Sequence, residues 1–292
     1  MQVGETITQR SASNLAFAFI MLPADRRRSM CSLYAFCREV DDIADDDGIP
    51  IETRRQELQR WRDDLRTAVD GGKPSLQVNQ ELQSVIKDYG LPFSLFDELL
   101  KGVESDLDTT RYETDAALQA YCYRVASVVG LLSIEVFGYQ NERCQQYAVQ
   151  LGLALQYTNI LRDVWSDAQR GRIYLPREDL ARFQVSEQEI LDGKFSPRYQ
   201  LMAGQMADRA REFYAAAAEL LPVEDRGSML AAEMMGRVYW RLLKRLEGCS
   251  FNVFTEQRIR VPKATKILLL LSTWLGTSLG MGRPPYARST SI

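Results

Sequence analysis

Hydrophobic residues along this chain recur at intervals of three and four positions, the spacing that gathers them on one face of a helix. Glu, Gln, Arg, Leu and Ala dominate long windows, and no segment alternates β-branched with polar residues as a half-buried strand would. The pattern predicts helices over residues 24–46, 51–70, 76–89, 93–105, 114–137, 142–167, 186–193, 197–221, 226–248 and 262–280.

The breaks between these segments carry turn-forming residues, as in Gly71-Gly72-Lys73-Pro74 and Gly90-Leu91-Pro92. None of the breaks is long enough, or low enough in complexity, to join two separate domains. We therefore expect residues 1–292 to form a single all-α domain with one large core.

Two of the predicted helices carry carboxylates at helical spacing. The first has Arg38, Asp41 and Asp45 within about 60° of one another around the helix axis, whereas Asp42 points further round. On the second helix the polar residues that share a face are Asn159, Arg162, Asp163 and Asp167. Each helix is therefore expected to present an ordered polar array.

One interpretation of these arrays is a solvated polar face on an ordinary amphipathic helix. The second helix is otherwise apolar, however, and buried carboxylates need partners or metal ions. Two such helices facing each other would supply hard oxygen ligands for Mg²⁺ and guanidinium groups for a diphosphate.

Composition narrows the chemistry further. The chain contains no histidine, so catalysis would have to use carboxylates, metal ions, Tyr or Arg. A net charge of −3 gives no electrostatic case for nucleic-acid binding. The five cysteines form no CxxC pair and no zinc site, and reduced thiols favour a cytoplasmic location.

The residues around both acidic arrays resemble the two signature motifs of the squalene/phytoene synthases. The first motif is Tyr34-Ala35-Phe36-Cys37-Arg38-Glu39-Val40-Asp41-Asp42-Ile43-Ala44-Asp45. The second is Leu155-Gln156-Tyr157-Thr158-Asn159-Ile160-Leu161-Arg162-Asp163-Val164, continuing through Asp167 to Gly171-Arg172-Ile173-Tyr174-Leu175-Pro176. The resemblance implies an isoprenoid synthase fold, a helical bundle around a central cavity in which two prenyl diphosphates are joined head to head.

The resemblance also implies roles for individual residues. The metal ligands, with Mg²⁺ ions bridging to diphosphate, would be Asp41, Asp45, Asn159, Asp163 and Asp167. The residues that bind the diphosphate would be Arg38, Arg162, Arg172, Arg258, Asn159 and Tyr239. Relatives often place Ser-Ser-Phe before the first helix, and Ser13 is the candidate for that position here, although the surrounding sequence differs.

The segment Tyr121-Cys122-Tyr123-Arg124-Val125-Ala126-Ser127-Val128-Val129-Gly130 resembles a further motif of the family, in which the leading Tyr lies near the reacting carbons. Tyr121 can stabilise a cation through its ring and move a proton through its hydroxyl, although it can also be one of many core tyrosines. Ser127 and Met235-Gly236-Arg237-Val238-Tyr239-Trp240 resemble the bacterial presqualene diphosphate synthases of hopanoid synthesis.

The expected reaction is therefore the condensation of two farnesyl diphosphates to presqualene diphosphate, without NADPH. The alternatives are phytoene synthesis from two geranylgeranyl diphosphates, squalene synthesis with NADPH, a phosphate hydrolase, and a non-catalytic family member that acts in assembly.

An apolar segment near the end of the chain, residues 262–281, follows several basic residues. It is expected to be either a core helix or an interfacial helix that contacts anionic lipid, which would place the protein peripherally on the inner face of the membrane.

Overall fold

The computed structural model describes residues 3–10, 18–278 and 284–287, and these ranges are helical apart from turns and one β-bridge between Arg111 and Ile173. The helices are α1 (Val3–Arg10), α3 (Ala24–Asp45), α4 (Ile51–Val69), α5 (Gln77–Tyr89), α6 (Phe93–Ser105), α7 (Asp115–Cys122), α8 (Val128–Phe137), α9 (Arg143–Gln169), α10 (Arg177–Arg182), α11 (Glu187–Leu191), α12 (Pro197–Leu220), α13 (Leu230–Gly248) and α14 (Lys263–Ser278). Short 3₁₀ turns lie at Phe19–Met21 and Pro285–Ala287. The predicted all-α class is confirmed.

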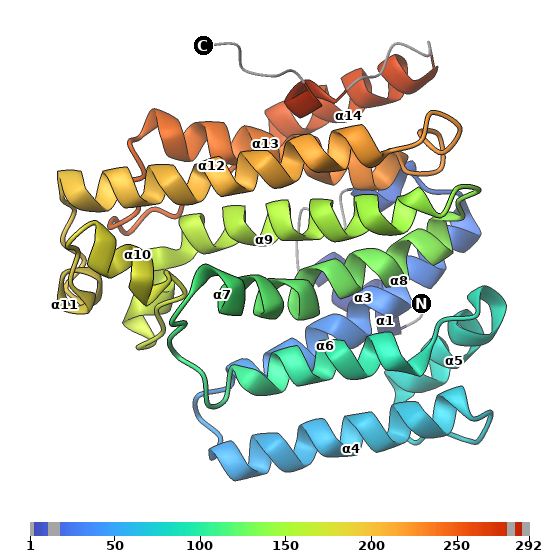
Figure 1. The fold of residues 1–292 in the computed structure, drawn as a ribbon. Coiled ribbons are helices and arrows are strands. Elements are labelled where there is room, and N and C mark those ends of the chain that lie inside the picture. Colours follow the sequence, from blue (N-terminus) through green and yellow to red (C-terminus); the bar gives the residue numbers. More distant parts are fainter. Residues whose placement is uncertain (1–2, 11–17, 279–283, 288–292) are drawn as a thin grey trace.

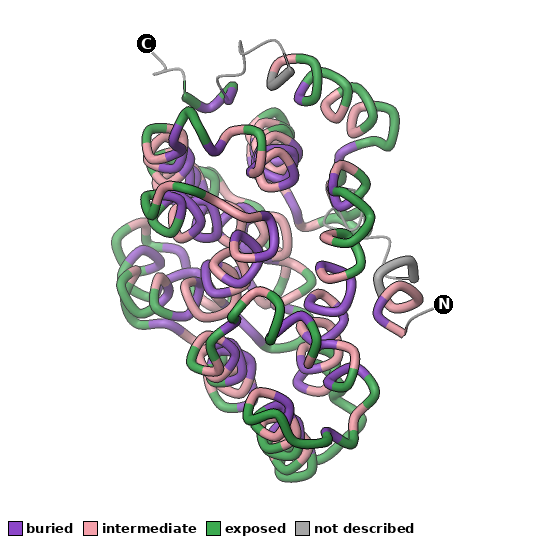
Figure 2. The backbone as a smooth tube through the Cα atoms, turned by 90° about the vertical axis from the view of Figure 1, so that its right-hand side faces the viewer, coloured by how far each residue is buried: buried purple, intermediate pink, exposed green. Residues whose placement is uncertain are grey.

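The long helix α9 runs through the middle of the molecule, with α12 along one side and α7 and α8 along another (Figure 1). Its tyrosines Tyr147 and Tyr157 are fully buried, as are Tyr199 and Tyr214 on α12. Buried positions gather where helices face one another, and exposed positions lie on the outer sides (Figure 2). One continuous hydrophobic core therefore surrounds α9.

Close helix contacts around α9 depend on small residues. An added Cβ at Gly152 of α9 would lie 2.5 Å from the Cα of Ser127, and one at Gly130 of α8 would lie 3.1 Å from the carbonyl oxygen of Ala148. Ser127 also donates a hydrogen bond to the carbonyl oxygen of Val149 at 2.8 Å. The small side chains let two backbones approach where larger residues would hold them apart.

The helix predicted over 114–137 is confirmed as a continuous helix over Asp115–Phe137, but it contains a turn that the sequence did not indicate. Thr114 caps α7, but Tyr123–Ser127 forms a π-helical turn before α8 begins. Such turns insert an extra residue into a helix and are frequent at functional sites. Asp115–Phe137 has the length and apolarity of a membrane span, yet half of its most apolar window is buried in the bundle, as is usual for a core helix.

Two short helices were not predicted. α1 precedes the first predicted element, and α10 lies in the segment before 186–193 that was left without one. In addition, the helix predicted from residue 226 begins at Leu230, because residues 222–229 form turns after Pro222.

Candidate active site

A cavity of about 660 Å³ opens between α3, α6, α7, α8, α9 and α13. Its walls contain almost every residue that the sequence assigned to a site: Arg38, Asp41, Asp45, Tyr121, Asn159, Arg162, Asp163, Asp167, Arg172, Tyr239 and Arg258. Ser13 lies outside the described residues. The structure thus brings together side chains that are more than 200 positions apart in the sequence.

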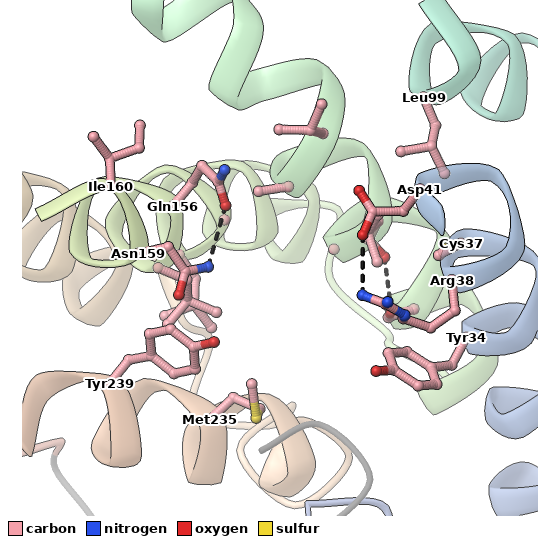
Figure 3. Close-up of a pocket in the computed structure, with 18 of the residues that line it drawn as sticks. Tyr34, Cys37, Arg38, Asp41, Leu99, Gln156, Asn159, Ile160, Met235 and Tyr239 are labelled. Carbon is pink, nitrogen blue, oxygen red and sulfur yellow. Dashed lines mark hydrogen bonds and ion pairs between the residues drawn. The ribbon is translucent and has the colours of Figure 1, made fainter. Parts of the chain in front are cut away.

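The two acidic helices lie on opposite sides of this cavity. Figure 3 shows Arg38 and Asp41 of α3 on one side, and Asn159 of α9 with Tyr239 of α13 on the other. Arg38 donates a hydrogen bond from Nη1 to Oδ2 of Asp41 at 3.0 Å. Asp42 forms an ion pair with Arg38 on the outer side, is not part of the cavity wall, and has a side chain that is 59% exposed. The peripheral position expected for Asp42 is confirmed.

Two carboxylates in the wall are each held by a pair of arginines. Arg170 and Arg172 contact Oδ1 of Asp45 from Nη1 at 2.9 Å and 2.8 Å. Burial alone would raise the pKa of Asp45, but these hydrogen bonds outweigh it and keep the pKa below its ordinary value. Asp45 therefore stays ionised at neutral pH.

The second such pair involves the helix α9. Arg162 and Arg258 donate from Nε to Oδ1 of Asp163 at 2.8 Å and 2.7 Å. Burial again acts to raise the pKa of this carboxyl, and the two guanidinium groups hold it below its ordinary value. The arginines of the site are therefore already paired with carboxylates.

In the other two motif aspartates, nearby arginines do not outweigh the effect of burial on the pKa. Burial, and then the charge of Asp45, raise the pKa of Asp41 to about 6. Burial and the charge of Asp163 raise the pKa of Asp167 to about 7. Clustered buried carboxylates of this kind are stabilised in the ionised form by a nearby cation.

The donors also fit a divalent cation. Within the described ranges, no three carboxylate or thiol residues are already gathered as a metal site. However, Oδ1 of Asn159 is buried without a hydrogen-bond partner in the same wall as Asp163 and Asp167. Carboxylate and amide oxygens are the ligands that Mg²⁺ prefers, so the residues present suit that ion.

Tyr121 belongs to a small network that the sequence did not reveal. Its hydroxyl donates a hydrogen bond to Oδ2 of Asp106 at 2.8 Å, and the hydroxyl of Tyr174 donates to Oδ1 of the same carboxylate at 2.9 Å. The rings of Tyr121 and Tyr174 stack with their centroids 5.3 Å apart. Burial raises the pKa of Asp106 to about 6 despite the two hydrogen bonds.

Asp106, Tyr174 and Arg170 are cavity residues for which the sequence gave no role. Tyr174 lies in the second signature and Arg170 lies beside it. Their positions in the sequence could therefore have indicated that they belong to the site. Asp106 follows Glu104-Ser105 at the end of α6. Polar and acidic residues are common at the ends of helices, so an aspartate there does not stand out in the sequence. Nothing in its local sequence distinguishes it.

Much of the remaining cavity wall is apolar, although Ser133 and Gln156 also line it. The apolar part comes from α6, the π turn, α8, α9 and α13, and includes Val103, Val125, Val129, Phe137, Leu151 and Met235. One end therefore offers charged groups and the other offers a hydrocarbon surface, an arrangement suited to an amphipathic ligand with an anionic head.

Comparisons with known proteins agree with this geometry. A model of the squalene/phytoene synthase family matches residues 8–265. The chain is 35% identical to a presqualene diphosphate synthase of Rhodopseudomonas palustris over 89% of this chain and 92% of that protein. It is 32% identical to a 15-cis-phytoene synthase of Synechocystis sp. over 94% of this chain and 84% of that protein. Among solved structures, a dehydrosqualene synthase bound to a ligand superposes with a TM-score of 0.84 and 28% identity, covering 94% of this chain and 95% of the other.

Proposed function

Because the chain belongs to the squalene/phytoene synthase family and is a prenyltransferase with the isoprenoid synthase fold, we propose that it condenses two farnesyl diphosphates head to head into presqualene diphosphate. The observation that carries this proposal is the single cavity with paired acidic helices and arginines at one end and apolar walls at the other. Ser127 and the similarity to a presqualene diphosphate synthase favour farnesyl substrates and a reaction that stops before reduction by NADPH.

The charged end would hold the diphosphate groups. Arg38, Arg162 and Arg258 line the wall on both sides, and planar guanidinium groups bind phosphate oxygens in pairs. Arg172 and Tyr239 complete the cationic and hydrogen-bonding surface. These groups orient the substrate head and stabilise the negative charge that develops as diphosphate leaves.

Members of this family generally use divalent metal ions. In this chain the residues that would hold Mg²⁺ are Asp41, Asp45, Asn159, Asp163 and Asp167, and the ions would neutralise the diphosphate and make it a better leaving group.

Loss of diphosphate from one substrate breaks its C1–O bond and leaves an allylic cation. The apolar walls exclude water from this cation, which would otherwise be hydrolysed. The C2–C3 π electrons of the second substrate then form a bond to C1, and loss of a proton closes the cyclopropane ring. The departing diphosphate is one candidate proton acceptor. The other is the hydroxyl of Tyr121, which would pass its own proton to the Asp106 carboxylate. The aromatic rings of Tyr121 and Tyr174 would stabilise positive charge nearby.

The second candidate function is phytoene synthesis from two geranylgeranyl diphosphates. It is favoured by the similarity to phytoene synthases, which is as extensive as that to the presqualene diphosphate synthase. The two candidates differ in the length of hydrocarbon that the apolar end has to accept. An assembly role without catalysis is disfavoured because all four motif aspartates are present.

The test is incubation of the protein and Mg²⁺ with farnesyl or geranylgeranyl diphosphate, each with and without NADPH, followed by identification of the products. We expect presqualene diphosphate from farnesyl diphosphate, with NADPH making no difference. Phytoene as the preferred product would support the second candidate, and squalene formed only with NADPH would contradict a reaction that stops at presqualene diphosphate.

A further inference from the structure

The helix α14 turns five of its large apolar side chains away from the protein. Exposed fractions are 50% for Ile267, 66% for Leu268, 49% for Leu271, 50% for Trp274 and 50% for Leu275. These five positions fall within a stripe about 120° wide along the helix. Among the described residues, five of the eleven exposed large hydrophobic side chains lie on this one helix, so they form a patch and are not scattered.

The side of α14 that faces the protein carries Leu269 and Leu270, which are partly buried against the core, and Thr273 between them. Thr273 is 1% exposed, its Oγ1 donates to the carbonyl oxygen of Leu269 at 2.6 Å, and the same atom lies 4.0 Å from Sδ of Met234 on α13. Leu269 and Leu270 hold α14 on the core, whereas the five exposed side chains lie on the other face and are not covered by the protein. The apolar stripe of α14 is therefore suited to a surface outside the molecule.

Basic residues lie at the start of this helix. Arg260 and Lys263 are exposed, and Lys266 is half-buried beside them. Partial burial and the charges of Arg260 and Lys263 lower the pKa of Lys266, which shows that the three cations are close together. Residues 257–292 contain six basic residues and no acidic one, although the whole chain has a net charge of −3. This region is thus a cationic segment of an acidic protein.

We propose that α14 docks on a membrane surface that carries anionic lipid headgroups, with its apolar stripe at the acyl boundary and Arg260, Lys263 and Lys266 at the phosphates. An apolar stripe with basic residues beside it is typical of helices that lie in the membrane interface. The sixteen residues of α14 extend about 24 Å, less than the roughly 30 Å of a bilayer core, so the helix lies along the surface.

Charge complementarity favours lipid over a second copy of the chain. In a symmetric contact between two copies, the cations beside α14 would face the same segment of the other copy, and residues 257–292 contain no acidic side chain to pair with them. The inner leaflet of a cell membrane, in contrast, has a negative surface potential that attracts clustered basic residues. Figure 1 shows α14 at the outer edge of the molecule, on the side opposite α4, so a flat surface can reach it.

The position of α14 also relates the membrane to the cavity. It packs on α13, and α13 supplies Ala231, Ala232, Met235 and Tyr239 to the cavity wall. One helix therefore separates the proposed lipid contact from the cavity. The docking inference itself rests on α14 alone and stands whichever substrates the enzyme joins.

The experiment is sedimentation of the full-length protein with vesicles of phosphatidylglycerol and phosphatidylcholine, compared with vesicles of phosphatidylcholine alone. We expect binding to the anionic vesicles that weakens with added salt. The pair Leu268→Ser/Leu271→Ser should weaken it by roughly 100-fold, since each Leu loses its burial in lipid. The matched control is Leu201→Ser on α12, where Leu201 is 65% exposed and should not matter.

A second pair of variants isolates the charges. Arg260→Gln/Lys263→Gln should weaken binding to anionic vesicles by roughly 25-fold, because each basic residue near such a surface contributes about fivefold. Lys73→Gln, in the exposed turn between α4 and α5, is its control. Tryptophan emission should shift to the blue when anionic vesicles are added, and the shift should disappear in Trp274→Phe.

Wild-type protein that stays in solution with anionic vesicles at low salt would overturn the proposal. Equal binding by Leu268→Ser/Leu271→Ser and its control Leu201→Ser would also overturn it. A dimer in solution that Leu268→Ser/Leu271→Ser converts to a monomer would also overturn it, since a second copy would then cover α14. Circular dichroism checks that each variant folds. If Leu268→Ser/Leu271→Ser does not fold, the comparison of Arg260→Gln/Lys263→Gln with its control tests the proposal.

Discussion

Asp106→Asn should make this protein more stable at pH 8 and at the same time less active. Burial raises the pKa of Asp106 from 3.8 to about 6 in the folded chain. Between these two values the folded protein binds more protons at this site than the unfolded chain does, so stability falls as the pH rises. At pH 8 the Asp106 carboxylate is ionised in both the folded and the unfolded chain. The folded protein then bears the full free-energy cost of burying that charge.

The magnitude follows from the size of the shift. Two pKa units at about 1.4 kcal/mol each give a ceiling of about 3 kcal/mol at pH 8. By the same relation, the destabilisation caused by Asp106 is less than about 2 kcal/mol at pH 5 and less than about 1 kcal/mol at pH 4. Because Asn is neutral and nearly isosteric, the variant should gain about 1–3 kcal/mol in free energy of unfolding at pH 8, and most of that gain should vanish by pH 4.

Activity should move in the opposite direction. The Asp106 carboxylate accepts hydrogen bonds from Tyr121 and Tyr174 on separate oxygens, whereas Asn has one acceptor oxygen. Losing a charge-assisted hydrogen bond costs about 1.5–3 kcal/mol, so a misplaced Tyr121 should lower kcat by roughly 10- to 100-fold. Tyr121→Phe should give a similar loss, and the double variant should be little worse than either.

The assay combines denaturant unfolding at pH 8 and pH 4 with kcat and KM for farnesyl diphosphate. Asp108→Asn is the matched control, because its side chain is 62% exposed and lies outside the cavity wall. The electrostatic reasoning would be refuted if Asp106→Asn were less stable than the wild type at pH 8. It would also be refuted if the substitution changed the free energy of unfolding equally at pH 8 and pH 4. An unchanged kcat would refute the positioning role of Asp106.

Three further outcomes are expected. Asp41→Asn should lower kcat by roughly 100-fold or more, while Asp42→Asn, outside the cavity wall, should change it less than about threefold, and similar losses in both would contradict the assignment of faces. Gly152→Ala should lower the free energy of unfolding by about 1–3 kcal/mol, because its Cβ would meet backbone at 2.5 Å. In Gly204→Ala the nearest atom to the added Cβ is 4.0 Å away, so this variant should raise the free energy of unfolding by about 0.5–1 kcal/mol. Equal effects of the two substitutions in urea unfolding would argue against the close helix contact. Arg258→Gln should raise KM for the diphosphate substrate more than it lowers kcat, which steady-state kinetics would show; a loss in kcat alone would place Arg258 elsewhere in the reaction.

Most helices could be predicted from the sequence because their amphipathic period and their Gly and Pro breaks are local signals. The π turn at Tyr123–Ser127 could not, since one additional residue in a turn leaves the hydrophobic pattern almost unchanged. The short helix α10 was missed because six residues are too few to show a period.

The site shows the same division between local and tertiary information. The faces of α3 and α9 could be computed from residue spacing, and the family motifs indicated what they bind. Asp106 could not be predicted, because its role arises only where the end of α6 meets Tyr121 and Tyr174 from distant parts of the chain. The sequence left open whether residues 262–281 form a core helix or an interfacial helix. Only the burial of Thr273 and the packing of Leu269 and Leu270 on the core show which side of α14 faces the protein.

If the cavity arginines bind diphosphate as proposed, the doubly bridged carboxylates Asp45 and Asp163 are tethered competitors of that diphosphate. Each already occupies two guanidinium groups, so a diphosphate that reaches Arg162 and Arg258 must displace Asp163 from them. The affinity of the site for a simple anion such as sulfate should therefore be lower than the number of arginines suggests. Any group that draws a carboxylate away from its arginines raises the affinity for diphosphate, and diphosphate raises the affinity for that group by the same factor. Self-masking of this kind would make the site selective for a diphosphate that arrives together with a cation.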